Sequence, residues 1–113
     1  MNEKLREIIN HYGVDKQLKY FQSEIFELNE AIIKYHNKGI MDNVIDAVCS
    51  VMSLGNYEDK YRNAVIEEIA DVMVMLKQFQ LYYNIPTKDI REVMNKKIDR
   101  QLERIAQEDK NVW

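Results

Sequence analysis

The sequence is poor in residues that cross-link or interrupt a chain. It contains one cysteine, one proline and three glycines among 113 residues. A single thiol, Cys49, cannot form a disulfide within the chain, so a disulfide framework is excluded and a reducing compartment is expected. The scarcity of proline and glycine is typical of a packed helical protein.

Three further absences exclude classes of function. No segment approaches the roughly 20 consecutive apolar residues that cross a bilayer. The first ten residues alternate charges with isoleucines, which is unlike a secretory signal. Sixteen basic and 19 acidic residues give a net charge of -3 without a long run of one sign, so no basic surface for nucleic acid is expected. We therefore expect a cytoplasmic protein that binds neither membranes nor nucleic acid.

Helical periodicity is present along most of the chain. The three glycines and Pro86 each follow a periodic stretch and predict helix ends. The expected helices cover about residues 2–12, 15–38, 41–54, 59–84 and 87–110. Asp15 and Thr87 are the expected N-caps of the second and last helices. No strand is predicted, so the expected fold is all-α, an antiparallel bundle of four to five helices in one domain over residues 1–113.

Apolar side chains occupy more of these helices than one core requires. The second helix has a single stripe formed by Leu18, Phe21, Ile25, Leu28 and Ile32. The fourth is apolar almost all round from Ile69 to Leu76. The last helix has as its expected inward positions Ile90, Val93 or Met94, Ile98 or Lys97, Leu102 and Ile105. The adjacent Ile32 and Ile33 give the second helix apolar positions beyond its stripe, and five helices provide too few layers to cover these as well as the segment from Ile69 to Leu76, so we expect a homo-oligomer, at least a dimer.

One charge interrupts the most apolar segment, "IADVMVML" at residues 69–76. This charge, Asp71, lies three residues after Glu68, so the two side chains are neighbours on one helical face. Two like charges on an apolar surface repel each other, and burial of an unpaired ion costs several kcal/mol. The pattern therefore predicts a positive partner, either a metal ion or a basic side chain of the last helix.

The second helix repeats this spacing with Glu24 and Glu27. If the two helices pack antiparallel, four carboxylates converge, and oxygen ligands without histidine or cysteine select Mg²⁺ or Mn²⁺. Neither His11 nor His36 lies three residues after a glutamate, which disfavours a di-iron centre. The alternative for Glu24 and Glu27 is a solvated helix face.

These motifs resemble those of the MazG-like, all-α nucleoside triphosphate pyrophosphohydrolases, whose pattern is E-E-x-x-E followed by E-x-x-D. Here they read "SEIFE" at residues 23–27 and "EIAD" at residues 68–71, and the resemblance covers about residues 10–106. The resemblance implies that Glu24, Glu27, Glu68 and Asp71 bind Mg²⁺. It also implies hydrolysis of a (deoxy)nucleoside triphosphate to the monophosphate and pyrophosphate, in a homodimer or a dimer of dimers.

The sequence departs from the family pattern in two places. Ser23 replaces the first glutamate of the first motif. The segment between Glu27 and Glu68 is also longer than the family's usual hairpin, and the predicted helix over about 41–54 accounts for the excess.

The last helix carries three basic residues at three- and four-residue steps, Lys97, Arg100 and Arg104. They are candidate ligands of substrate phosphate, and the alternative is a solvated face paired with Asp99 and Glu103. Two other functional classes remain open. One is a weakly active or inactive helical bundle that binds a nucleotide or a protein partner, and the other is a structural oligomerisation module.

Overall fold

Helices make up the described part of the chain, apart from its ends and short connections. The computed structural model describes residues 1–37, 47–48, 51–52 and 57–110. Its long helices are α1 (Asn2–Tyr12), α2 (Val14–His36), α4 (Tyr57–Tyr82) and α5 (Thr87–Lys110). These residues contain no strand, and the all-α prediction is confirmed for them. Most of the helix predicted over about 41–54 lies outside the described residues, as do Gly39 and Gly55.

Gly13 separates the first two helices by a single residue. Its φ of 87° and ψ of 151° lie in a region that is essentially restricted to glycine. Its N–H donates to the Ile9 carbonyl at 2.8 Å, which ends α1, and its carbonyl accepts from the Gln17 N–H at 3.1 Å, which begins α2. The predicted break is confirmed. The prediction of Asp15 as N-cap is wrong, because α2 already begins at Val14.

A tight turn joins α4 to α5. Asn84 adopts a positive φ of 56°, and the Pro86 carbonyl accepts from the N–H groups of Asp89 and Ile90. The Gln80 amide donates to the Ile85 carbonyl at 3.0 Å and to the Thr87 hydroxyl at 2.8 Å. Thr87 was predicted as the N-cap, but it is the first residue of α5, and Pro86 supplies the preceding carbonyl.

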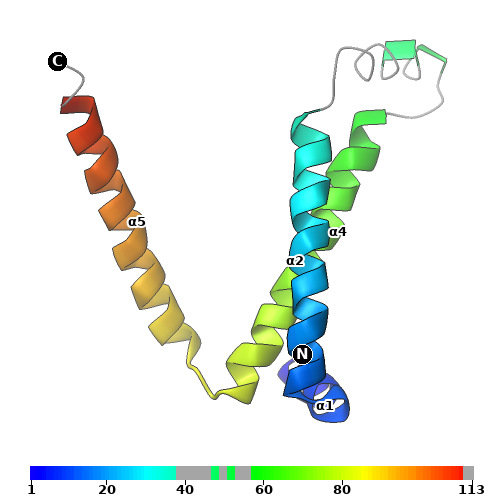
Figure 1. Cartoon of the computed structure of the whole chain (residues 1–113), viewed down its shortest axis with the longest axis vertical. Coiled ribbons are helices and arrows are strands. Elements are labelled where there is room, and N and C mark those ends of the chain that lie inside the picture. The colour runs from blue at the N-terminus through cyan, green and yellow to red at the C-terminus, as the bar shows by residue number, and fades with distance from the viewer. Residues whose placement is uncertain (38–46, 49–50, 53–56, 111–113) are drawn as a thin grey trace.

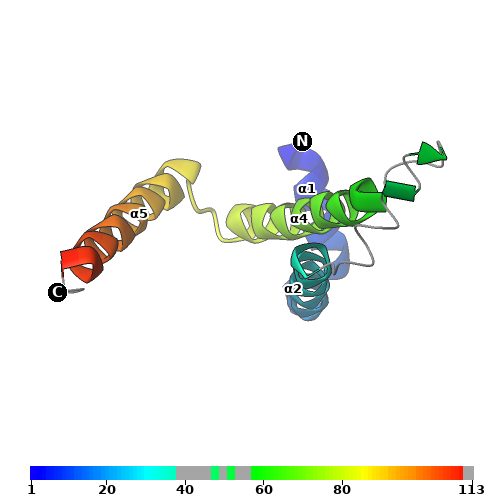
Figure 2. The ribbon, with the colours of Figure 1, turned by 90° about the horizontal axis from the view of Figure 1, so that it is seen from above.

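The core lies where α2 packs antiparallel to α4 and α1 crosses the end of this pair (Figures 1 and 2). Phe21 and Phe79 meet edge to face across the α2–α4 seam, with ring centroids 5.4 Å apart. The buried apolar side chains of the described residues come from α1 and α4: Leu5, Ile9, Val72 and Met75. Only part of the stripe predicted for α2 lies on this seam, since Leu18, Ile25 and Ile32 are exposed.

Helix α5 diverges from the other helices as the second arm of a V (Figure 1). The Cα radius of gyration is 19.7 Å, against about 13 Å for a compact domain of this length. No residue of α5 is buried. The side chains predicted to face inward are therefore exposed within one chain: Ile90, Val93, Met94, Lys97, Ile98, Leu102 and Ile105.

Helix α4 also presents uncovered apolar surface. Met73 is 63% exposed and Leu76 is 51% exposed, although both belong to the segment predicted to be central. Together with Phe79, Tyr83 and Ile90 they line an open apolar hollow of about 470 Å³ at the base of the V, where α4 and α5 join (Figure 1). Within the described ranges, no helix combines the length and apolarity that crossing a membrane requires.

The conformation of Gly13 leads to a stability prediction. A Cβ at this position meets no atom within 4 Å, so the cost of Gly13→Ala is backbone strain alone. We expect the substitution to lower the free energy of unfolding by about 1–3 kcal/mol in urea denaturation. The control is Gln22→Ala at an exposed position of α2. This variant should change the free energy of unfolding by less than about 0.5 kcal/mol. Equal stability of the two variants would show that α1 and α2 tolerate another connection.

Candidate functional site

Three carboxylates meet between α2 and α4. Glu24 comes from α2, and Glu68 and Asp71 come from adjacent turns of α4. One carboxylate oxygen from each lies within 4.8 Å of the other two. The antiparallel packing of two helices with three-residue carboxylate spacing produces this arrangement, as the sequence predicted for these three residues.

Glu27, the fourth predicted ligand, lies at the edge of this cluster. It is exposed and lines a separate hollow of about 210 Å³ together with Glu68. A three-residue step rotates a side chain by about 60° from the starting face, so α2 cannot point Glu24 and Glu27 equally at the seam. The structure therefore brings together three of the four predicted carboxylates, with Glu27 beside them.

Glu24 is the carboxylate that the fold buries. Its side chain is 3% exposed, whereas Asp71 is exposed to the adjoining cavity. The sequence had indicated Asp71 as the charge set in apolar surroundings, and this interpretation is corrected. The residues next to Asp71 in the sequence are apolar, but the face of α4 that carries Asp71 lines the open cavity.

Burial and like charges perturb the two glutamates in the same direction. Desolvation raises the pKa of Glu24 above 4.5, and the charges of Asp71 and Glu27 add to this effect, while a hydrogen bond from the Tyr20 hydroxyl opposes it. Desolvation likewise raises the pKa of Glu68, followed by the charges of Glu27, Asp71 and Glu24. Both groups are thus destabilised as anions in the absence of a cation.

Two carboxylate oxygens in the cluster have no hydrogen-bond donor. They are Oε2 of Glu24 and Oε2 of Glu68, both inaccessible to solvent. The charged groups that perturb these glutamates are all carboxylates. Buried anionic oxygens without donors or cations fit a hard divalent ion such as Mg²⁺ or Mn²⁺, which takes oxygen ligands. These carboxylate oxygens are thus ligands of the kind that the predicted metal ion binds.

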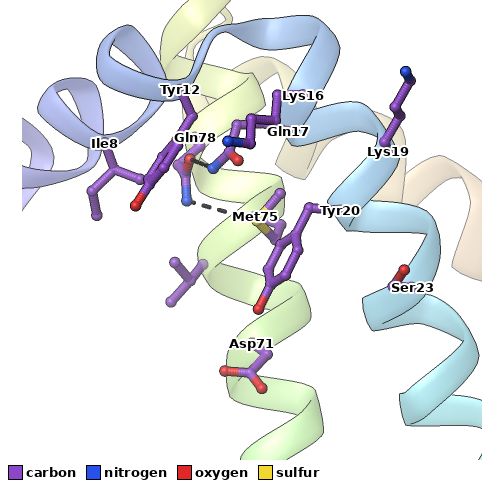
Figure 3. A pocket seen from close by; sticks show the side chains of 11 residues that line it. Ile8, Tyr12, Lys16, Gln17, Lys19, Tyr20, Ser23, Asp71, Met75 and Gln78 are labelled. Atoms are coloured by element: carbon purple, nitrogen blue, oxygen red, sulfur yellow. Dashed lines mark hydrogen bonds between the residues drawn. The ribbon is translucent and has the colours of Figure 1, made fainter.

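A cavity of about 680 Å³ adjoins the cluster (Figure 3). Asp71 and Ser23 lie on its wall at one end, and Gln17 and Gln78 lie at the other end, joined by a hydrogen bond of 2.8 Å. The Tyr20 ring lies between these two ends, and its hydroxyl points toward Asp71. This volume falls within the range of about 300–1,000 Å³ that is usual for small-molecule sites.

Helix α1 and the start of α2 also contribute to the cavity wall. Ile8 and Tyr12 come from α1, and Lys16 and Lys19 come from the first turns of α2. The Lys16 ammonium lies 5.1 Å from the centre of the Tyr12 ring, a cation–π distance. The cavity therefore combines an acidic end with cationic and aromatic groups.

Sequence reasoning missed most of this wall. No sequence motif indicated Tyr20, which is 56% exposed and forms a hydrogen bond with Glu24. Gln17 lies seven residues before Glu24, and Gln78 lies seven residues after Asp71, so each amide shares a helical face with a carboxylate. This repeated seven-residue spacing was the available signal.

The basic residues predicted to bind phosphate lie elsewhere in the chain. Lys97, Arg100 and Arg104 are exposed on α5, which diverges from the α2–α4 pair that holds the carboxylates (Figure 1). The prediction that they face the acidic cluster is therefore wrong within one chain. The predicted alternative, an ion pair between Asp71 and a basic residue of this helix, fails for the same reason.

Comparison of the chain with protein-family models, with curated proteins and with solved structures finds no match.

The raised pKa of Glu24 gives a stability prediction with a defined sign. The folded metal-free protein binds a proton at Glu24 at a higher pH than the unfolded chain does, so this carboxylate destabilises the fold above its folded pKa. In EDTA at about pH 8, Glu24→Gln should therefore melt at a higher temperature than wild type. The difference should shrink as the pH falls through the raised pKa toward 4.5, since wild-type Glu24 then becomes neutral too.

Glu30→Gln is the matched control for this measurement. Glu30 lies on the same helix, where it pairs with Lys34 at 3.5 Å on the surface. Its replacement should cost at most a few tenths of a kcal/mol, with no gain at high pH. A Glu24→Gln variant that is less stable than wild type at every pH would show that the ionised carboxylate is a structural group.

Proposed function

We propose that the protein is a Mg²⁺-dependent nucleoside triphosphate pyrophosphohydrolase. The observation that carries this proposal is the pair of buried oxygens without donors, on Glu24 and Glu68, beside Asp71 at the end of a nucleotide-sized cavity. Such oxygens are costly in a protein unless a cation satisfies them. A metal-bound triphosphate with its nucleoside in the cavity is the ligand that suits both features.

The proposed metal ligands are Glu24, Glu68 and Asp71, with Glu27 adding negative charge at the edge. When bound, Mg²⁺ supplies positive charge to offset that of the triphosphate and lowers the pKa of a coordinated water. The Tyr20 hydroxyl donates to Glu24 and so fixes the orientation of its carboxylate.

Other residues of the chain suit the remaining tasks of this reaction. Lys16 and Lys19 add positive charge to the wall of the cavity, which favours entry of a negatively charged ligand. The reaction consumes one water, whose hydroxyl oxygen bonds to phosphorus as the bond to pyrophosphate breaks. A carboxylate of the cluster accepts the released proton.

The resemblance of "SEIFE" and "EIAD" to the MazG-like motifs supports the same reaction. The motif residues Glu24, Glu68 and Asp71 lie together, and Glu27 lies next to them. Ser23 lines the cavity at the position of the missing first glutamate. An inactive nucleotide-binding bundle remains the alternative function, and turnover distinguishes the two.

We further propose that a second copy of the chain completes the fold. Within one chain, α5 exposes its apolar face and α4 exposes Met73 and Leu76. Pairing of two copies through these surfaces would bury them and bring Lys97, Arg100 and Arg104 near the neighbour's cluster, which α5 cannot reach in its own chain.

Activity should depend on the cluster and not on neighbouring surface carboxylates. Asp71→Asn and Glu68→Gln should each lower kcat for pyrophosphate release by more than about 100-fold, since even groups behind metal ligands typically contribute 10–100-fold. The assay is a panel of canonical and modified nucleoside triphosphates with Mg²⁺. Glu30→Gln on the surface of α2 should leave the rate nearly unchanged.

Two outcomes would contradict this proposal. Unfolding of Asp71→Asn in the absence of metal would show that the ionised Asp71 carboxylate stabilises the fold, which contradicts its assignment as a metal ligand. Retention of the nucleotide by wild-type protein, without pyrophosphate from any nucleotide in the panel, would favour the inactive binding module.

The oligomeric state is tested by sedimentation. At micromolar concentration we expect a dimer or tetramer, whereas a single species at the monomer mass of 13.5 kDa would rule out shared burial of the α4 and α5 surfaces. Ile98→Glu, at the middle of the exposed α5 face, should shift the distribution toward monomer. Lys96→Glu on the same helix makes a larger charge change at an exposed polar position, and we expect it to leave the distribution unchanged.

A further inference from the structure

An amide pair is buried at the far end of the cavity from Asp71. The side chain of Gln17 is 6% exposed and that of Gln78 is 2% exposed. The Gln17 Nε2 donates to Gln78 Oε1 at 2.8 Å, which joins α2 to α4 (Figure 3). Together with Glu24, they are the buried polar side chains of the described residues. Burial of polar groups is costly unless their hydrogen-bonding capacity is used.

The contacts of these amides leave much of that capacity free for a ligand. A carboxamide offers two donor hydrogens and two acceptor lone pairs. The bond between the amides uses one donor of Gln17 and one lone pair of Gln78. The second contact of Gln78 is to the Met75 sulfur at 3.8 Å, a weak acceptor. Since both residues line the cavity, a bound molecule can meet donors and acceptors side by side at this end.

The amides and the carboxylates occupy corresponding positions on the two helices. Gln17 precedes Glu24 by seven residues on α2, and Gln78 follows Asp71 by seven residues on α4. Seven residues are two helical turns, or about 10 Å along the axis. The antiparallel pair therefore holds one polar layer of carboxylates and one of amides, with the Tyr20 ring and Met75 between them.

We propose that Gln17 and Gln78 recognise the base of the nucleotide, so that this amide pair determines which nucleoside triphosphate the site accepts. The inference rests on the proposed function, because it takes the carboxylate layer as the triphosphate end. A nucleobase is a planar ring whose edge carries adjacent donors and acceptors, the complement of two neighbouring carboxamides. Tyr20 offers an aromatic face beside it, and Val74 and Met75 offer apolar contact.

A polar pocket of this kind discriminates through the cost of leaving its amides unpaired. A base whose edge matches the free donors and acceptors satisfies them, whereas a mismatched base buries them without partners. Selectivity should then reside in the two glutamines, and the chemistry in the carboxylates two turns away. Changing the amides should alter preference among bases more than it alters hydrolysis of the poorest substrate.

The test compares wild type with the double variant Gln17→Met/Gln78→Met. Removing both amides together leaves no orphaned partner, and methionine keeps nearly the same volume, so the fold should be retained. The matched control is Gln22→Met, at an exposed position of α2. Two measurements are made: kcat/KM for the four canonical deoxynucleoside triphosphates with Mg²⁺, and calorimetric binding of the four deoxynucleoside monophosphates in EDTA.

We expect wild type and Gln22→Met to prefer one base over the poorest by at least about tenfold in both measurements. In the double variant, the four bases should fall within about threefold of one another. A double variant that keeps the wild-type order of preference, or a wild type that treats all four bases alike, overturns the role of the amide pair. Base-selective binding that the double variant loses, without hydrolysis by wild type, overturns the hydrolase proposal alone.

Discussion

The burial of Glu24 against two other carboxylates is the constraint on which the rest of the site depends. Helices α2 and α4 pack closely enough to exclude water from oxygens of Glu24 and Glu68, yet the charged groups that perturb these glutamates are carboxylates. The folded chain therefore carries an electrostatic cost that a fully apolar seam would avoid. A bound cation would remove this cost, and this relation supports the proposed metal site.

The same seam explains why the described part of the chain has so little apolar core. Its buried side chains include the polar residues Gln17, Glu24 and Gln78 beside four apolar ones. Edge-to-face packing of Phe21 on Phe79 and the crossing of α1 supply the apolar contact that keeps α2 and α4 together. Apolar packing and the polar cluster thus share one interface, and apolar side chains of α4 and α5 remain exposed outside it.

Sequence patterns predicted the local features well and the tertiary ones in part. Helix ends at Gly13 and Pro86 followed from backbone chemistry, which acts within a few residues. Three of the four carboxylates meet as expected, because three-residue spacing on antiparallel helices depends little on detail. The structure buries Glu24 and not Asp71 because of how α2 is rotated about its axis. The spacing of apolar residues in the sequence does not determine that rotation. The divergence of α5 depends on the turn at Asn84, and a helical stripe does not specify which chain it packs on.

The cavity wall comes from two parts of the chain that a single residue, Gly13, connects, so substitutions can change the two parts separately. Its acidic end belongs to α2 and α4 alone, whereas Ile8 and Tyr12 on its opposite wall belong to α1, which is attached through one glycine. Substitutions in α1 can therefore reshape the wall while the carboxylates keep their positions. The first helix can therefore change the shape of the cavity while the other two helices keep the acidic cluster in place.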